Sequence, residues 1–311
     1  MFSPFLAIAP WIRINLPPCH IDVPYSTEEF SSLSLDGAYD FKANKKLGSG
    51  ASGSVFLATH KMTQNRVAVK RFLCNYNSVK DFRRELASLR VLRGHPNIVN
   101  LIDSFGGKRP ALVMEVANHG DLESYLEDHG PLTEDAAKYI MLQLLNAIQA
   151  CHDKNIMHRD IKLGNVLVSA IDGVRLTVQL ADFGFSAKSK HRLQRYCGTK
   201  GYMAPEIRAN KFYDHSIDIW SLGITMHALL TGKVPSNGKL TIDRLSPMLQ
   251  KYPNKRLTAK QLLGHFWFMD HSTLTQFVKR LIDGINGYYD EICGLCGTYK
   301  IHCEVFVEKK P

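Results

Sequence analysis

Three short motifs in one order constrain this chain more than any other feature of its sequence. They are HRDIKLGN at residues 158–165, DFG at residues 182–184 and APE at residues 204–206. They supply a carboxylate that can accept a proton (Asp160), a lysine that can face a phosphate (Lys162), and two oxygen donors of the kind that Mg²⁺ prefers (Asn165 and Asp182). This order and spacing are those that phosphoryl transfer from ATP requires. One triplet could arise by chance, but three in this order predict a phosphoryl-transfer site.

The segment upstream of these motifs has features that suit a nucleotide. Residues 48–55 read GSGASGSV, in which Gly48, Gly50 and Gly53 let the backbone approach the phosphates of ATP. Alternating apolar segments at residues 41–47 and 55–58 flank the glycines, so a strand, a turn and a strand are expected. The run VAVK at residues 67–70 predicts the next strand, which would hold the ammonium of Lys70 near the phosphates.

Over residues 41–268 the chain resembles the eukaryotic protein kinase family in these motifs. The resemblance implies an α+β bilobal fold, with a β-rich N-lobe that contains one αC helix and with a helical C-lobe. It divides the chain into an N-terminal extension (1–40), an N-lobe (41–113), a hinge (114–117), a C-lobe (118–268) and a C-terminal tail (269–311). The prolines and serines of the first 40 residues predict an irregular segment there.

The resemblance also implies a role for individual residues. Glu85, on a helix predicted over residues 79–92, would pair with Lys70, and the alternative is a solvated acid on the helix surface. Leu89 would join a hydrophobic spine with Leu101, His158 and Phe183, and Met114 would be the gatekeeper. Asp218 and Arg256 would be structural anchors, Asp218 fixing the catalytic loop and Arg256 pairing with Glu206.

The implied cofactors are ATP and Mg²⁺. The catalytic residues would be Asp160, Lys162, Lys70 and Glu85, and the metal ligands Asn165 and Asp182. The implied contacts of the nucleotide are Gly48, Gly50, Gly53, Val55, Ala68, Lys70, Met114, Glu115, Ala117 and Leu167.

The form of the catalytic loop, with Lys162 two residues after Asp160, is similar to that of serine/threonine kinases, as is the Cys-Gly-Thr run at residues 197–199. We therefore expect a serine/threonine protein kinase. An ATP-binding pseudokinase that acts as a scaffold is the alternative, and a kinase of small molecules or lipids is a third reading. Among kinase groups, the chain resembles the calmodulin-dependent and polo-like branches.

Two regions depart from the family pattern. Residues 234–256 are shorter than usual, which removes most of the αG region, and residues 245–253 look like the helix that precedes Arg256. The position where many such kinases have a phosphorylated threonine is Arg195. Between Asp182 and Glu206 there are five cations and no acid, so we expect either a mobile basic loop or an acidic partner. If an anion is what the loop lacks, Arg195→Glu should raise activity.

A hydroxyl elsewhere in the segment, at Ser186, Ser189 or Tyr196, is the alternative phosphosite. Asp121 lies where related kinases hold an acid that meets an arginine upstream of the phosphorylated residue, whereas Gly164 leaves the neighbouring acidic position empty. At most a single upstream basic preference is therefore expected, with tolerance of acidic residues near the basic segment.

The composition narrows the partners and the compartment. The formal net charge is +10, the seven cysteines are scattered, and no apolar run approaches the roughly 18 residues of a membrane span. These features predict an intracellular protein, cytoplasmic or nuclear, with neither membrane nor nucleic acid as a partner, and the positive charge favours an acidic regulator or substrate. The resemblance to protein kinases implies protein substrates, and we expect a monomer. The tail predicts an amphipathic helix over residues 272–284. Its cysteines, Cys293, Cys296 and Cys303, would be free thiols, with a zinc site that includes His302 as the alternative.

Overall fold

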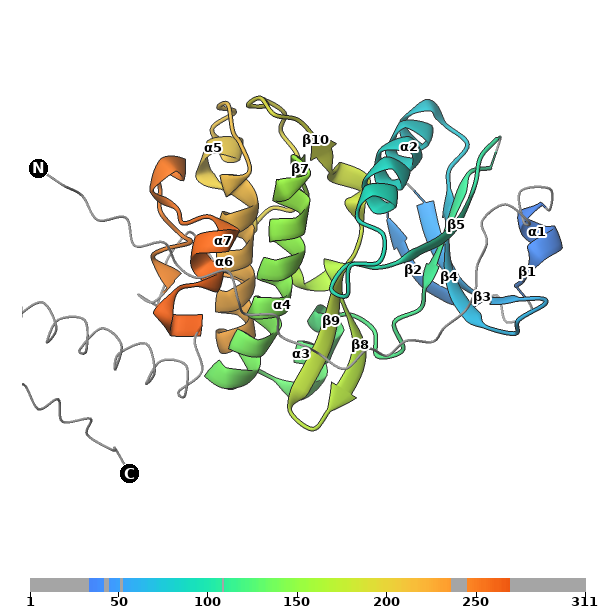
Figure 1. The fold of residues 1–311 in the computed structure, drawn as a ribbon, viewed down its shortest axis with the longest axis horizontal. Coiled ribbons are helices and arrows are strands. Elements are labelled where there is room, and N and C mark those ends of the chain that lie inside the picture. The colour runs from blue at the N-terminus through green and yellow to red at the C-terminus, as the bar shows by residue number, and fades with distance from the viewer. Residues whose placement is uncertain (1–33, 42–44, 51–52, 108, 236–244, 269–311) are drawn as a thin grey trace, which may run out of the picture.

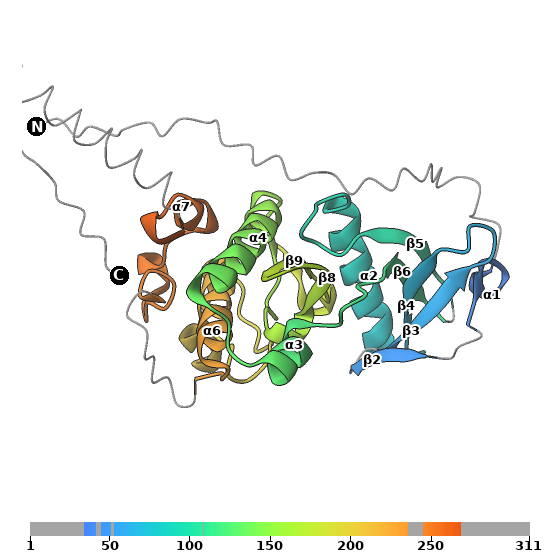
Figure 2. The ribbon, with the colours of Figure 1, turned by 90° about the horizontal axis from the view of Figure 1, so that it is seen from below.

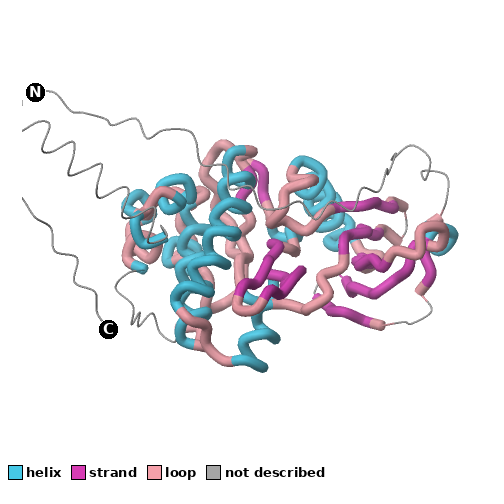
Figure 3. Tube along the Cα trace, turned by 60° about the horizontal axis from the view of Figure 1, so that its bottom comes forward, coloured by secondary structure: helices cyan, strands magenta, loops and turns pink. Residues whose placement is uncertain are grey.

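The structure is a computed structural model that describes residues 34–41, 45–50, 53–107, 109–235 and 245–268. The described chain forms two lobes, one built from strands with the helix α2 and one built mainly from helices (Figures 1 and 3). The α+β bilobal fold that the sequence predicts is thereby confirmed. None of the helices in these residues is both long and apolar enough to cross a membrane.

The N-lobe is one antiparallel sheet whose strands follow the order β1-β3-β4-β6-β5, with β2 on the free part of β3. The strands are β1 (Tyr39–Asp40), β2 (Lys46–Gly50), β3 (Gly53–His60), β4 (Arg66–Phe72), β5 (Leu101–Phe105) and β6 (Ala111–Glu115). The first predicted strand, at residues 41–47, is described only in part, because residues 42–44 lie outside the described chain. In the described part, β2 pairs with β3 from Lys46 through the glycines to Gly50.

The register of this sheet decides which side chains share a face. Val55 pairs with Lys70, Lys70 pairs with Leu112, and Ala68 pairs with Met114. Because residues two apart on a strand point the same way, these side chains lie on one face, the one from which Lys70 reaches α2. The other face is apolar and includes Val67, Val69, Ala111 and Val113.

That second face is covered by residues of the segment that was predicted to be irregular. A short helix, α1 (Leu35–Ala38), begins at Ser34, whose side chain accepts a hydrogen bond from the Gly37 N–H. Tyr39 of β1 then packs edge-on against His60 and Phe105. The prediction of an irregular segment up to residue 40 is therefore wrong for residues 34–40, because the apolar face of the sheet gives them a surface to bury.

Helix α2 (Tyr76–Val91) is the αC helix of the prediction and begins three residues before the predicted start at 79. Its N-cap is Asn75, which accepts a hydrogen bond from the Ser78 N–H and so fixes the start. Phe82 and Leu89 are buried, and Phe82 packs edge-on against Phe72 of β4. These contacts fix the face of α2 that meets the sheet.

The C-lobe is arranged around two buried helices, α4 (Glu134–Asp153) and α6 (Ser216–Thr231), with α3 (Leu122–His129), α5 (Pro205–Arg208) and α7 (Ala259–Leu263) around them (Figure 2). Residues 217 to 229 of α6 are all buried, so this helix is enclosed by the lobe rather than lying on its surface. Two small antiparallel sheets, β7 (Ile156–Met157) with β10 (Ala187–Lys188) and β8 (Val166–Asp172) with β9 (Arg175–Leu180), hold the loops between them. These loops contain the HRDIKLGN and DFG motifs.

The helix predicted over residues 245–253 is a turn. Only one turn forms, with the amides of Met248 and Leu249 both bonded to the Leu245 carbonyl. Pro247 disfavours the helical conformation of the residue before it, and the turn fits closely on α6, where a methyl group at Gly223 would lie 2.7 Å from Leu249. The described residues between α6 and α7 contain one further element, the 3-10 helix η5 (Pro253–Lys255).

Two predictions for the C-terminal tail lie outside the described residues. These are the amphipathic helix over residues 272–284 and the choice between free thiols and a zinc site at Cys293, Cys296, His302 and Cys303. Both stay predictions. So does the shortening of the αG region, since residues 236–244 also lie outside the described part of the chain.

Candidate active site

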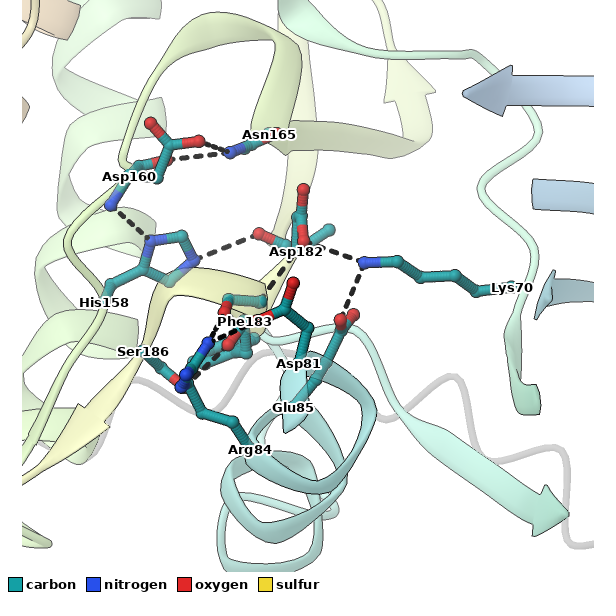
Figure 4. A network of polar contacts seen from close by, with 12 residues as sticks. Lys70, Asp81, Arg84, Glu85, His158, Asp160, Asn165, Asp182, Phe183 and Ser186 are labelled. Carbon is teal, nitrogen blue, oxygen red and sulfur yellow. Dashed lines mark hydrogen bonds and ion pairs between the residues drawn. The ribbon is translucent and has the colours of Figure 1, made fainter. Parts of the chain in front are cut away.

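The lysine of β4 meets two carboxylates from different parts of the chain. Lys70 Nζ lies 2.6 Å from Glu85 Oε2 on α2 and 2.8 Å from Asp182 Oδ1 (Figure 4). Lys70 and Glu85 are buried, so the alternative reading of Glu85 as a solvated surface acid is wrong. The Lys70–Glu85 pair connects the sheet to α2, and the contact of Lys70 with Asp182 connects the same lysine to the C-lobe.

Burial and charge oppose each other in this cluster. Burial disfavours the ammonium of Lys70, but the negative charges of Glu85 and Asp182 outweigh burial and raise its pKa. Burial raises the pKa of Asp182, yet the nearby Lys70 charge wins and lowers it. Burial raises the pKa of Glu85 to about 7, against the attraction of Lys70. One buried cation thus faces two acids, so the electrostatics of the site favour the binding of a further positive charge.

Helix α2 is tied to the DFG segment at two more points. Arg84 Nη1 donates to the Gly184 carbonyl at 2.6 Å and to Asp81 Oδ1 at 2.7 Å. Ser88 Oγ lies 2.8 Å from Ser186 Oγ, and both residues are buried. Ser88 follows Arg84 by four residues and Glu85 by three, so its side chain is a neighbour of both on the helix surface. This part of the helix surface faces the 3-10 helix η2 (Phe183–Phe185).

Asp160 is held by three neighbours inside the catalytic loop and the segment that follows DFG. Thr199 Oγ1 donates to Asp160 Oδ1 at 2.7 Å, and Asn165 Nδ2 donates to Asp160 Oδ2 at 3.1 Å. Lys162 Nζ donates to Thr199 Oγ1 at 3.1 Å and lies 3.7 Å from Asp160 Oδ2. The side chains of the predicted catalytic residues Asp160 and Lys162 are therefore close together, and the Thr199 hydroxyl is hydrogen-bonded to both.

The two predicted metal ligands keep oxygens that could bind a cation. Asn165 uses its amide nitrogen on Asp160, both at the side chain and at the carbonyl, which leaves its amide oxygen for another partner. Asp182 uses Oδ1 for Lys70 and the Gly184 N–H, and within the described chain no hydrogen bond reaches Oδ2. Its backbone is left-handed, at φ 58°, a strain that proteins tolerate at functional sites. This oxygen donor set fits Mg²⁺.

The nucleotide side of the site is formed by the sheet face described above. Val55, Ala68 and Met114 share that face with Lys70, while Leu167 of β8 is half-buried in the C-lobe. Gly53 must be glycine, because a methyl group there would lie 2.1 Å from the Arg71 carbonyl oxygen. Gly48 and Gly50 have open space beside them. Glu115 ends β6, and Ala117 follows it in the segment that leads to the C-lobe.

Asp218 anchors the catalytic loop from inside α6. Its Oδ2 accepts from the His158 N–H at 2.9 Å and its Oδ1 accepts from the Arg159 N–H at 2.8 Å. His152 Nε2 lies 2.9 Å from Oδ2. Although burial raises the pKa of Asp218, the hydrogen bonds and the charge of His152 lower it below its usual value. The predicted anchoring role of Asp218 matches these contacts.

His158 connects this loop to the DFG segment. Its Nε2 lies 3.0 Å from the Ala181 carbonyl, to which it donates, and its Nδ1 accepts from the Asp160 N–H at 3.3 Å. Its ring packs edge-on against Phe183, with 4.7 Å between centroids. Leu89 and Leu101 are buried in the same large core cluster as Phe183, and His158 is buried as well. The role of these four residues as one spine stays a prediction.

The second predicted anchor is also present. Arg256 forms a two-bond pair with Glu206, with Nη1 to Oε1 at 2.5 Å and Nη2 to Oε2 at 2.8 Å. Both side chains are buried, and the Arg256 guanidinium lies over the Trp220 ring. The pair fixes the end of the DFG-to-APE segment to the lower C-lobe.

The segment between Asp182 and Glu206 is ordered by its own contacts, which the sequence analysis did not foresee. β10 pairs with β7, and Leu193 exchanges backbone hydrogen bonds with Tyr213. Ser186 is fully buried and its hydroxyl donates to the Phe183 carbonyl. As a phosphosite, Ser186 would have to leave this environment, whereas Ser189 is half-buried and Tyr196 is exposed.

Sequence reasoning missed four residues of this site. Arg84 and Ser88 could have been found, because they share a helix face with Glu85. Tyr213 gave no local signal, since it contacts the site only through tertiary structure. Glu123 could have been found only from the space beside Gly164, where an added methyl group would lie 2.8 Å from Glu123 Oε2.

A two-lobed α+β fold with a buried Lys-Glu-Asp cluster, an Asp-Thr-Lys triangle and an anchored catalytic loop is the architecture of a protein kinase. The family model of the protein kinase domain matches residues 41–245, which is more than half of the chain. This chain belongs to the eukaryotic serine/threonine protein kinase family.

The relatives include Aurora kinases and plant kinases. An Aurora kinase of Saccharomyces cerevisiae is 36% identical over 236 residues, which cover 73% of this chain and 62% of the relative. An Aurora kinase of Dictyostelium discoideum is 34% identical over 261 residues, covering 75% and 67%. The serine/threonine protein kinase OSK3 of Oryza sativa is 31% identical over 259 residues, covering 74% and 50%.

The match thus spans between half and two thirds of the length of these relatives. The resemblance to the calmodulin-dependent or polo-like branch is not tested by these relatives and stays a prediction.

Proposed function

We propose that this protein transfers the γ-phosphate of ATP to serine or threonine hydroxyls of protein substrates. The observation that most supports the proposal is the arrangement at Asp160. Its carboxylate is held by Thr199 and Asn165, and the ammonium of Lys162 lies 3.7 Å from it. A carboxylate beside an ammonium suits the orientation of a hydroxyl for attack on a phosphate.

Each residue has a chemical role in this proposal. Asp160 accepts the hydrogen bond of the substrate hydroxyl and orients it in line with the phosphate, since a loose transition state depends on position more than on base strength. Lys162 stabilises charge on the transferred group, and Lys70, held by Glu85, contacts the phosphates further from the reacting oxygen. Thr199 bridges Asp160 and Lys162 and so fixes their separation.

Asn165 and Asp182 are the residues that would hold Mg²⁺ in this proposal, through the oxygens that their hydrogen bonds leave unused. Magnesium supplies neutralisation of the charge that develops on the phosphate oxygens. The open space at Gly48 and Gly50 lets the backbone of the glycine-rich segment approach the phosphates, while Val55, Ala68, Met114, Glu115, Ala117 and Leu167 would surround the adenine.

An ATP-dependent labelling assay tests this function. Purified protein with Mg²⁺ and labelled ATP should phosphorylate a generic basic protein, and hydrolysis of the product should yield phosphoserine or phosphothreonine. Asp160→Asn and Asp182→Asn should each lower the rate by orders of magnitude, because each removes a group that acts on the reacting phosphate or hydroxyl. Asp153→Asn, at the exposed end of α4, is the control. Wild-type protein that binds ATP but labels nothing would favour the pseudokinase alternative.

We further propose that the protein acts inside the cell as a monomer, on protein substrates, and without membrane or nucleic acid as a partner. The motifs support a protein substrate, because the Cys-Gly-Thr and Ala-Pro-Glu runs frame a segment on which a peptide can lie. An acidic region of a partner would be attracted by the five exposed cations between Asp182 and Glu206. They are Lys188, Lys190, Arg192, Arg195 and Lys200.

A further inference from the structure

The side chain of Arg159, in the catalytic loop, is buried and fully engaged with the protein itself. Its Nε donates to the Phe185 carbonyl at 2.6 Å, and its Nη2 lies 3.4 Å from the Ser186 carbonyl. Its Nη1 donates to the hydroxyl of Tyr213 at 3.0 Å. Within the described residues no carboxylate pairs with this guanidinium, so neutral oxygens satisfy a cation that is only 6% exposed.

Tyr213, between α5 and α6, joins Arg159 to the activation segment, which is the segment between Asp182 and Glu206. Its side chain is 2% exposed, and its hydroxyl donates to the Arg195 carbonyl at 3.0 Å. Its backbone N–H and carbonyl both bond to Leu193, at 2.8 and 2.9 Å. Burial raises the pKa of Tyr213, so its hydroxyl keeps the proton that it donates.

In many kinases this connection is made by a phosphate, which orders the activation segment through charge-assisted hydrogen bonds to arginines. In this chain the corresponding position is Arg195, a residue that accepts no phosphate and adds a further positive charge. The tyrosine hydroxyl reaches the backbone of that same residue. The link between the catalytic loop and residue 195 is therefore present without any modification.

We propose that Tyr213 is a positioning residue, whose hydroxyl connects Arg159 to the backbone of Arg195 and thereby keeps the activation segment in its active arrangement without phosphorylation. The inference rests on the proposed kinase activity and adds how that activity is regulated. The sequence alone predicted either a mobile basic loop or a loop that needs an acidic partner. In this proposal, hydrogen bonds within the protein itself hold the segment in place.

The hydroxyl acts on the chemistry through a short path. Arg195 lies four residues before Thr199, whose hydroxyl is bonded to Asp160. Arg159 is the neighbour of Asp160, and its own N–H is fixed by Asp218. Loss of the Tyr213 hydroxyl would free the segment at residue 195 and loosen Thr199 from Asp160. The contacts of Lys70 with Glu85 and Asp182 do not involve Tyr213 and would remain.

The test compares full-length wild type with Tyr213→Phe, which keeps the ring and removes only the hydroxyl. Tyr139→Phe is the matched control, since Tyr139 lies on α4 beside Arg175, outside the site. Tyr213→Phe should lower kcat roughly tenfold or more, the effect of losing a hydrogen bond to a charged group, while the KM for ATP stays within about twofold. Phosphatase treatment of the wild type should leave its rate unchanged.

Arg195→Glu distinguishes a connecting role from ordinary core packing. In the wild type Arg159 already has its partners, so this substitution should not raise the rate. In Tyr213→Phe it should recover at least about threefold in kcat, because a carboxylate at residue 195 offers Arg159 a new partner of opposite charge. Ordinary loss of packing would lower the melting temperature and would not be recovered by this second substitution.

Three results would overturn the inference. They are equal kcat values for Tyr213→Phe and Tyr139→Phe, a loss that Arg195→Glu does not recover, and loss of wild-type activity on phosphatase treatment with the phosphate mapped to Ser189 or Tyr196. A wild type that transfers no phosphate under any treatment would instead refute the proposed function, and with it the premise of this inference.

Discussion

The hydroxyls of Ser88 and Ser186, 98 residues apart in sequence, are hydrogen-bonded at 2.8 Å in the interior between α2 and the DFG segment. Ser186 Oγ donates to the Phe183 carbonyl, so the shared proton of the pair belongs to Ser88. Together with Arg84 and the Lys70–Glu85 pair, this bond fixes α2 against the element that contains Asp182. The position of α2 is thus set by hydrogen bonds as well as by the ion pair.

From this contact we expect Ser88→Ala to lower kcat/KM by about two- to tenfold, the usual effect of one neutral hydrogen bond. Combined with Ser186→Ala it should add little, since both substitutions remove the same bond. Steady-state rates for the two single variants and the double variant measure this coupling. Ser78→Ala, a buried serine on the same helix, is the control, and strictly additive losses would contradict a direct connection.

Peptide selectivity should depend on Glu123. Its carboxylate lies beside Gly164, the position at which related kinases have an acidic residue and this chain has none. The carboxylate of Asp121, by contrast, accepts a hydrogen bond from the Ser124 N–H at the start of α3. Glu123→Gln should therefore weaken the preference for a basic residue upstream of the phosphorylated hydroxyl by roughly two- to fivefold, as expected for an exposed ion pair.

A positional peptide array on wild type and Glu123→Gln measures this preference. Glu127→Gln, which removes an exposed acid one turn further along α3, should leave the array pattern unchanged. A strict requirement for two upstream arginines, or a pattern insensitive to Glu123, would refute this account of specificity.

The contribution of Asp218 to stability should depend on pH in a defined direction. Hydrogen bonds and the charge of His152 lower its pKa in the folded protein, so the folded state binds the carboxylate proton less readily than the unfolded chain does. Its stabilisation is then fully present above about pH 5, where the unfolded carboxyl is ionised, and is lost as the pH falls through the lowered pKa.

Asp218→Asn should cost about 1.5–3 kcal/mol of unfolding free energy at pH 7, the value for hydrogen bonds to a buried charge. The difference from wild type should stay constant down to about pH 5 and narrow below about pH 4. Denaturant unfolding across this range measures it, with Asp153→Asn as the control. A difference that widens in acid would show that the sign is wrong.

The contacts that could be predicted are those made by residues in the motifs themselves. Lys70 with Glu85, Asp218 with the catalytic loop, and Arg256 with Glu206 all join positions whose type and order are specified in the sequence. Each is a charge or a strong acceptor that must be paired when buried, so the motif implies the partner.

The contacts that could not be predicted depend on backbone groups and on tertiary packing. Arg159 donates to the carbonyls of Phe185 and Ser186 and to the hydroxyl of Tyr213. Every residue has a backbone carbonyl, so the sequence does not indicate which carbonyls Arg159 contacts. The turn at residues 245–249 replaced the helix that the resemblance predicted, because of Pro247 and the close approach of Leu249 to Gly223. Pro247 is visible in the sequence of this segment, but the approach to Gly223 depends on tertiary packing.

The cover that Tyr39 provides for the N-lobe sheet has a practical consequence for anyone who expresses the catalytic unit alone. A fragment that starts at residue 41, where both the motif boundary and the family match begin, would lack α1 and β1 and leave Val67, Val69, Ala111 and Val113 facing water. Such a fragment should melt at a lower temperature and self-associate, whereas one that starts at Ser34 should not. Size-exclusion chromatography of the two fragments would decide where the stable unit begins, and we expect that point to lie ahead of the first recognisable kinase residue.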